Sequence, residues 1–228
     1  MKQLALDIGL ATGPTLGGFL AGPNEPALRH LELWLGGAQA PTLHSPVPTY
    51  LWGEGGSGKT HLLEAVRAGL RDQGASVGWL QPGLADPPPF DEAWGAVLMD
   101  DVHLYTAVQQ HAAFTWFVSA QSLQRGVIAA GLEPPAALKL REDLRTRLGW
   151  GHVFHLQVLS EAERRAVLRQ AADERGVMLS DEVLDYVLHR FSRDLGSLLE
   201  LLAKLDGYAL QTQRAITIPL IRSMLENE

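Results

Sequence analysis

The chain has 228 residues, 46% of them hydrophobic, enough to bury one large core or a larger domain with a small companion. It has no cysteine, which excludes disulfides and thiolate metal sites, and its formal net charge of −7 argues against a protein that holds DNA by general attraction to phosphate. No hydrophobic run approaches the ~20 residues of a membrane-spanning helix, and the N-terminus is too polar for a signal peptide. We therefore expect a soluble protein of the cytoplasm that does not bind membranes.

The first part of the chain alternates predicted strands and helices. After a segment rich in Gly and Pro, the spacing of apolar residues predicts a helix over 25–35, and prolines then force a loop. The strands predicted after it cover 49–52, 76–80, 96–99 and 127–130, and the helices cover 60–73 and 108–123. This alternation favours right-handed crossovers, and so a parallel sheet with helices on both faces.

The last part of the chain has a purely helical pattern. Ser160 and Glu163 form a capping box, Ser180 precedes a second helix, and Pro219 starts a short last helix after a third over 195–210. We place a domain boundary near residues 156–159. The predicted domains are an α/β nucleotide-binding domain over residues 11–158 and a helical lid domain over residues 159–228, preceded by a separate peptide over residues 1–10.

The strongest chemical signal is the glycine-rich segment after the strand over 49–52. It matches the P-loop pattern at every fixed position, with Gly53, Gly55, Gly56, Ser57, Gly58, Lys59 and Thr60, and His61 completes the predicted nucleotide-binding set. Glycines let the backbone wrap closely around phosphates, to which the N–H groups of the loop and of the next helix point. Lys59 is expected to reach the β and γ phosphates, and the Thr60 hydroxyl to ligate Mg²⁺. The predicted cofactors are ADP or ATP with Mg²⁺.

Two acidic residues end the apolar strand over 96–99. Asp100 stands where a Walker B aspartate helps to hold Mg²⁺, directly or through water. Asp101 could orient an attacking water, a role that Glu usually has in this class of protein. The alternative is a turn with two solvated acids, which would be preferred if the P-loop were absent.

Four landmarks, over residues 52–60, 97–103, 144–151 and 216–219, occur in the order and spacing found in DnaA-type AAA+ proteins. The chain resembles this family over nearly its whole length, and within it the short regulatory members that inactivate the replication initiator DnaA. An initiator would need a further DNA-binding domain after the lid, whereas this sequence ends at Glu228. The resemblance implies an AAA+ P-loop domain with a five-stranded parallel sheet, followed by a small all-α lid domain.

The N-terminal peptide acquires a role from the same resemblance. Gln3, Leu4, Leu6 and Ile8 resemble the peptide with which the regulatory members dock on the sliding clamp, the β subunit of the DNA polymerase. An amide anchor is followed there by spaced apolar side chains. From the residues alone, the segment would be a frayed tail or an edge strand.

A basic segment resembles the family's arginine-finger box. Alignment with the family makes Arg147 the finger. An arginine suits this role because its planar and permanently charged guanidinium can meet the charge that develops on a γ-phosphate bound by a neighbouring subunit. Its neighbours Arg145 and Arg141 could contact the partner or its DNA. The alternative is a solvated basic face of a helix.

The sensor positions depart from the family pattern. Leu132 stands near the position of a polar sensor residue, and the sensor arginine of the lid falls on Gly196, with Arg193 as the nearest substitute. This combination implies tight nucleotide binding and weak intrinsic hydrolysis. We expect the histidines to bind no metal and the tryptophans to lie in the core; the latter are Trp34, Trp52, Trp79, Trp94, Trp116 and Trp150.

The resulting functional hypothesis is a negative regulator of replication initiation. It would dock on the DNA-loaded clamp and stimulate hydrolysis of DnaA-bound ATP through Arg147, with DNA contacted only indirectly or weakly. One rival is a stand-alone AAA+ ATPase or loader that acts as a homo-oligomer, and another is a DNA-binding paralogue of the initiator, which the acidic composition disfavours. Whether the free protein is a monomer or a homodimer is left open.

Overall fold

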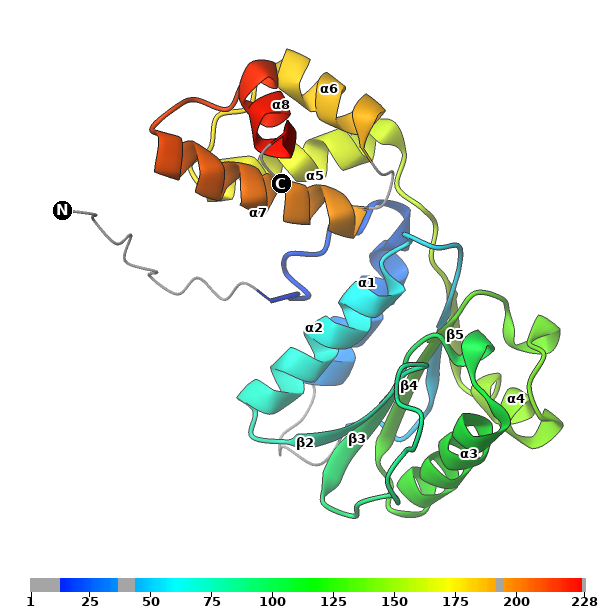
Figure 1. The fold of residues 1–228 in the computed structure, drawn as a ribbon. Coiled ribbons are helices and arrows are strands. Elements are labelled where there is room, and N and C mark those ends of the chain that lie inside the picture. Colours follow the sequence, from blue (N-terminus) through cyan, green and yellow to red (C-terminus); the bar gives the residue numbers. More distant parts are fainter. Residues whose placement is uncertain (1–12, 37–43, 192–194, 227–228) are drawn as a thin grey trace. The chain divides into compact units, whose positions relative to one another are not determined.

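The structure of the protein, a computed structural model, describes residues 13–36, 44–191 and 195–226 (Figure 1). The chain forms two compact units. The first contains Glu25–Trp52 and Lys59–His155, together with the described residues that end at Ala21. The second contains Leu156–Glu228 and two short segments from earlier in the chain, Gly22–Asn24 and Gly53–Gly58.

A five-stranded sheet in the order β2-β3-β4-β1-β5 is the centre of the first unit. The strands are β1 (Thr49–Trp52), β2 (Ser76–Leu80), β3 (Trp94–Met99), β4 (Gly126–Gly131) and β5 (His152–His155). Every neighbouring pair is parallel, so the predicted sheet is confirmed. The apolar patterns predicted the first four strands, whereas only the resemblance implied a fifth.

Helices cover both faces of this sheet (Figure 1). One face is covered by α1 (Glu25–Gly36) and α2 (Lys59–Asp72), and the other by α3 (Ala107–Ser122) and α4 (Glu142–Leu148). Val97 and Met99 of β3 belong to the core on the α3 side, whereas Leu98 between them is buried on the opposite face, as the period of a strand requires. The described residues also form three short 3₁₀ helices, η1 (Gly22–Asn24), η2 (Val102–Leu104) and η3 (Pro135–Ala137).

The second unit is helical and has its own core. Its helices are α5 (Glu161–Glu174), α6 (Asp181–Arg190), α7 (Leu195–Thr212) and α8 (Ile218–Glu226). The predicted capping box is present at α5, where the Ser160 side chain accepts from the Glu163 N–H and the Glu163 carboxylate accepts from the Ser160 N–H. Leu168, Leu184, Leu202 and Leu220 bring the four helices to one apolar core. The predicted all-α lid is therefore confirmed.

The two early segments of the second unit lie beside the chain that enters α5. A side-chain carbon added at Gly53 would lie 2.1 Å from the Leu156 carbonyl oxygen, so only glycine fits this close approach of two backbones. Asn24, 2% exposed, donates to the Gln157 carbonyl at 2.9 Å and accepts from the Gln157 N–H at 2.8 Å. Within the described ranges, no helix has the length and apolar character needed to cross a bilayer.

Candidate functional site

The P-loop occupies the connection between β1 and α2, as the sequence predicts for this motif. The Ser57 N–H donates to the Glu54 carbonyl at 3.3 Å and closes a tight turn. Gly58 has a φ of +93°, a conformation that residues with side chains rarely adopt. No atom lies within 4 Å of the side-chain position of Gly55. The loop thus turns sharply before the N-terminus of α2. Because Gly55 has no side chain, the space beside the loop backbone at this position is open.

Three of the predicted site residues lie together where this turn meets the end of β3. The Thr60 hydroxyl donates to Asp100 Oδ2 at 2.7 Å, and the other carboxylate oxygen accepts from the Asp101 N–H at 3.0 Å. Asp100 is 5% exposed and Lys59, one residue before Thr60, is 6% exposed. The fold therefore brings a carboxylate to a hydroxyl from which it is 40 residues distant in the sequence, next to the residue that carries the ammonium group.

Burial shifts the pKa values of both charged groups. It raises the pKa of Asp100 above its ordinary value, and the Thr60 hydrogen bond acts against that rise. It lowers the pKa of Lys59, and the negative charges of Asp101 and Asp100 act against that fall. Hydroxyl and carboxylate oxygens are the donors that Mg²⁺ prefers. Since a cation beside Asp100 would offset the burial of its charge, Thr60 and Asp100 fit a magnesium site.

Asp101 has a different environment from its neighbour. Its backbone lies in the left-handed region, with φ of 48°, at the start of η2. Its Oδ1 lies 4.0 Å from His103 Nδ1, and its side chain is 40% exposed. The two acids are thus adjacent, one buried against Thr60 and one open to solvent, and the proposed catalytic role of Asp101 stays a prediction.

His61 contacts a segment that the sequence analysis did not single out. Its Nε2 lies 3.2 Å from the Thr15 carbonyl oxygen, and its ring centroid lies 5.5 Å from that of Phe19. Burial lowers the pKa of His61. Thr15 and Phe19 therefore lie beside the first turn of α2. Only tertiary structure brings Phe19 there, and no motif marks it.

The structure places the sensor positions only in part. Leu132 follows β4 directly and is 43% exposed, so an apolar side chain faces solvent where a polar sensor is expected. Gly196 lies in the first turn of α7. Arg193 lies outside the described residues, as do Gln3, Leu4, Leu6 and Ile8, and the roles proposed for them stay predictions.

The predicted arginine finger contacts two aromatic rings. Arg147 lies in the last turn of α4, and its Cζ is 4.7 Å from the centroid of the Trp150 ring and 5.2 Å from that of Phe114. Trp150 is 63% exposed, so the prediction that the tryptophans lie in the core is wrong for this one. The prediction is confirmed for Trp34 and Trp116, whereas Trp52, Trp79 and Trp94 are half-buried. Trp150 lies in the turn after α4, and its ring contacts the Arg147 guanidinium and not the side chains of the core.

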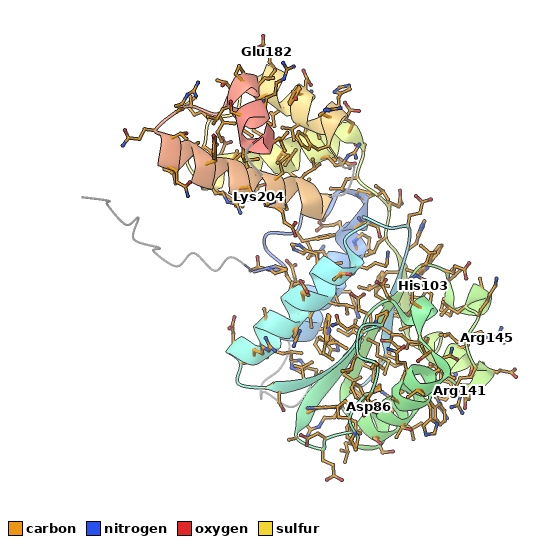
Figure 2. The ribbon with its side chains drawn as sticks, viewed as in Figure 1. Asp86, His103, Arg141, Arg145, Glu182 and Lys204 are labelled. Carbon is orange, nitrogen blue, oxygen red and sulfur yellow. The ribbon has the colours of Figure 1, made fainter. Side chains whose placement is uncertain are left out.

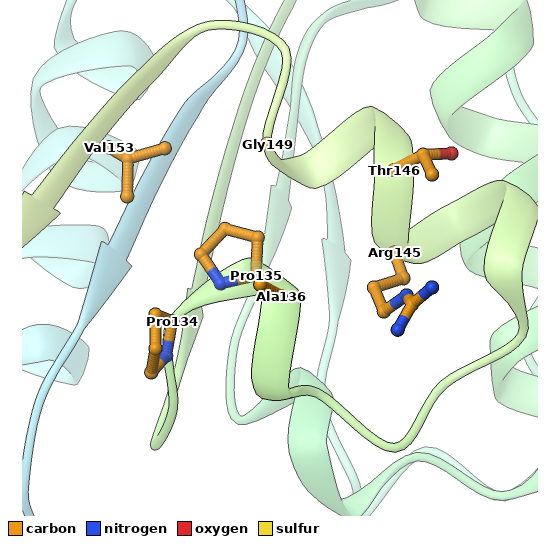
Figure 3. A pocket seen from close by; sticks show the side chains of 7 residues that line it. All are labelled: Pro134, Pro135, Ala136, Arg145, Thr146, Gly149 and Val153. Carbon is orange, nitrogen blue, oxygen red and sulfur yellow. The ribbon is translucent and has the colours of Figure 1, made fainter.

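The neighbouring arginines Arg141 and Arg145 lie in the same region of the first unit (Figure 2). Arg141 shares the Phe114 ring with Arg147, because its Cζ lies 5.0 Å from that centroid. Arg141 makes two hydrogen bonds of 2.7 Å to the Asp143 carboxylate. Arg145 lines an open pocket of about 480 Å³ between η3, α4 and β5 (Figure 3). The other lining residues are Pro134, Pro135, Ala136, Thr146, Gly149 and Val153. The basic segment is therefore not a uniform solvated face, because Arg141 and Arg147 share the Phe114 ring whereas Arg145 lines the pocket.

A parallel sheet with a P-loop between β1 and α2, acidic residues after β3 and a helical second unit define a P-loop protein of the AAA+ class. The family described as "Hda, lid domain" matches residues 161–225. A Haemophilus influenzae protein without an assigned function is 32% identical over 236 residues, covering 98% of each chain. The chain therefore belongs to the DnaA-type AAA+ family and, within it, to the Hda-like proteins.

Solved structures agree with this fold. Domain III of the Thermotoga maritima replication initiation protein DnaA has a TM-score of 0.72 at 20% identity, and the match covers 96% of this chain and 98% of that one. AMPPCP-bound DnaA from Aquifex aeolicus has a TM-score of 0.66 at 23% identity, covering 89% of this chain and 67% of that one. At these identities the likeness concerns the fold.

Proposed function

We propose that the chain binds ADP or ATP with Mg²⁺ at the P-loop. The observation that carries this proposal is the 2.7 Å bond between the Thr60 hydroxyl and the buried Asp100 carboxylate, beside the buried Lys59. Lys59 would hold the β and γ phosphates, and Thr60 and Asp100 would hold the metal, which neutralises phosphate charge when bound. The related DnaA of Aquifex aeolicus, solved with AMPPCP, supports an adenine nucleotide.

The function that best fits the whole chain is regulation of DnaA. In this proposal Arg147 acts in trans and stimulates hydrolysis of ATP bound to DnaA, which limits re-initiation of replication. The Hda family match and the apolar Leu132 at the sensor position support a regulator in preference to a motor that turns over its own ATP. The net charge of −7 supports a protein that reaches DNA through partners.

The same proposal includes docking on the DNA-loaded sliding clamp through Gln3, Leu4, Leu6 and Ile8. Its support is the resemblance of this peptide, and its test is separate. Deleting residues 1–8 should abolish capture of the chain by immobilised clamp while nucleotide binding at Lys59 persists. Capture that survives the deletion would remove the peptide from the proposal and leave the P-loop site untouched.

The experiment that tests the regulatory function is single-turnover hydrolysis of ATP preloaded on DnaA, with clamp-loaded DNA. The native chain should accelerate hydrolysis, and Arg147→Ala should lose about 10³- to 10⁵-fold of that acceleration, the usual effect of an arginine finger. Arg71→Ala is the matched control, because it removes an exposed arginine from the last turn of another helix, α2, which the proposal gives no role in stimulation. An inert native chain that consumes ATP alone would replace the regulator with the homo-oligomeric ATPase.

A further inference from the structure

The turn after α4 fixes the Trp150 ring against the Arg147 guanidinium. The Trp150 N–H donates to the Arg147 carbonyl at 3.1 Å, which folds the chain back over the last turn of the helix. On the other side, a side-chain carbon at Gly151 would lie 1.9 Å from the Pro48 carbonyl oxygen, which also accepts from the His152 N–H at 2.9 Å. The backbone of Trp150 is therefore held from both sides, although its ring is largely exposed.

The kind of contact matters for what Arg147 can still bind. A ring face attracts a cation without accepting its N–H groups in conventional hydrogen bonds, whereas a carboxylate occupies them. Arg141 combines both cases: its Cζ lies 5.0 Å from the Phe114 ring centroid, and its Nε and Nη2 both donate to Asp143. Arg147 Nε is buried and has no hydrogen-bond partner among the described residues, so it is not the donor that an incoming anion would meet. The aromatic contacts thus orient the guanidinium, and the anion would have to bind its terminal nitrogens.

We propose that Trp150 is a positioning residue for Arg147: its indole ring holds the guanidinium in the orientation that meets the γ-phosphate bound by DnaA. This inference rests on the proposed regulatory function. It predicts that loss of the ring slows hydrolysis at saturating concentration of the chain, because a freely rotating Arg147 reaches the phosphate less often. It also predicts little change in the concentration needed for half-maximal stimulation, since the docking surface remains.

The test compares Trp150→Leu with Trp150→Phe in the full chain, with ATP-loaded DnaA and clamp-loaded DNA. For a largely exposed ring, a cation–π contact of ~0.5–1 kcal/mol corresponds to a maximal rate about 2- to 5-fold lower for Trp150→Leu, with Trp150→Phe recovering most of it. The half-saturating concentration should change less than about 1.5-fold for both. Trp79→Leu is the matched control, because it removes an indole that lies 4.8 Å from the Arg67 guanidinium in the same unit.

Each other outcome overturns the proposal. Faster hydrolysis with Trp150→Leu means that the ring restrains Arg147 in an inactive position. An unchanged maximal rate with a raised half-saturating concentration makes Trp150 a docking contact. An equal loss in Trp79→Leu, or a lower melting temperature of Trp150→Leu alone, means general destabilisation. Failure of the regulatory function itself is distinct, since the native chain and Arg147→Ala would then give the same rate.

Discussion

Replacing Asn24 tests how the second unit holds the chain beside the P-loop. This side chain is buried and exchanges two hydrogen bonds with the backbone of Gln157. Asn24→Ala leaves a carbonyl and an N–H without these partners. At ~0.5–1.5 kcal/mol for each bond, the free energy of unfolding should fall by ~1–3 kcal/mol.

The magnitude can be measured by urea unfolding followed by circular dichroism. With a slope of ~2 kcal/mol per M, the loss lowers the midpoint for Asn24→Ala by ~0.5–1.5 M. Thr15→Val is the control: it removes one exposed bond, accepted from the Gly18 N–H at 3.0 Å, and should change the midpoint far less. A midpoint for Asn24→Ala equal to that of the control would refute the reasoning.

Asn24→Asp adds a test of the direction of each bond. Its carboxylate can still accept from the Gln157 N–H, but it faces the Gln157 carbonyl oxygen and repels it at neutral pH. Protonation restores a donor, so the introduced carboxyl should have a raised pKa in the folded state. The folded state then binds the proton more tightly, and the deficit of this variant should shrink as the pH falls toward about 4. A deficit that does not depend on pH would contradict this geometry.

Two further predictions follow from charges and caps. Burial raises the pKa of Asp100, so the folded state binds its proton more tightly than the unfolded state does, and the ionised carboxylate lowers stability at pH 7. Asp100→Asn should therefore raise the melting temperature of the nucleotide-free chain at pH 7, by an increment that shrinks as the pH falls toward 3.8, the ordinary pKa of an aspartate. The same variant should abolish the increase in melting temperature that Mg²⁺ with ATP produces. A lower melting temperature of the nucleotide-free variant at pH 7 would contradict this prediction. Ser160→Ala should cost ~1 kcal/mol in urea unfolding, because it removes the N-cap of α5, and an unchanged midpoint would show that this cap is dispensable. Hydrogen bonds from Ser160 lower the pKa of Glu163, so their contribution is present above the ordinary carboxyl value of 4.5 and is lost as the pH falls through the lower folded-state value.

The sequence predicted most of the fold because apolar periodicity is a local signal. Strand β3 is predicted by a short apolar run, and helix α5 is predicted by its capping box; both signals lie within a few residues of the element. The strand β5 does not, because its four residues, His152–His155, are mostly exposed and lie at the sheet edge. Its pairing with β1 depends on a partner about 100 residues away, which no local pattern encodes.

The candidate site divides in the same way. The P-loop is contiguous, so the motif located Lys59 and Thr60, and strand-end logic located Asp100. The contact of Phe19 with His61 and that of Trp150 with Arg147 are tertiary. A tryptophan is usually expected in the core, and only the three-dimensional course of the turn after α4 shows that this one covers an arginine instead.

The interleaving of the two units has a consequence for dividing the chain. A cut between His155 and Leu156 would separate Leu156–Glu228 from Gly22–Asn24 and from Gly53–Gly58, which belong to the same compact unit. The isolated C-terminal fragment would keep the Leu156 and Gln157 backbone but lose Gly53 and Asn24 beside it. The glycine-rich loop thus belongs to one compact unit while the strand before it and the helix after it belong to the other. An exchange of the whole second unit between relatives would therefore need more than a single junction in the gene.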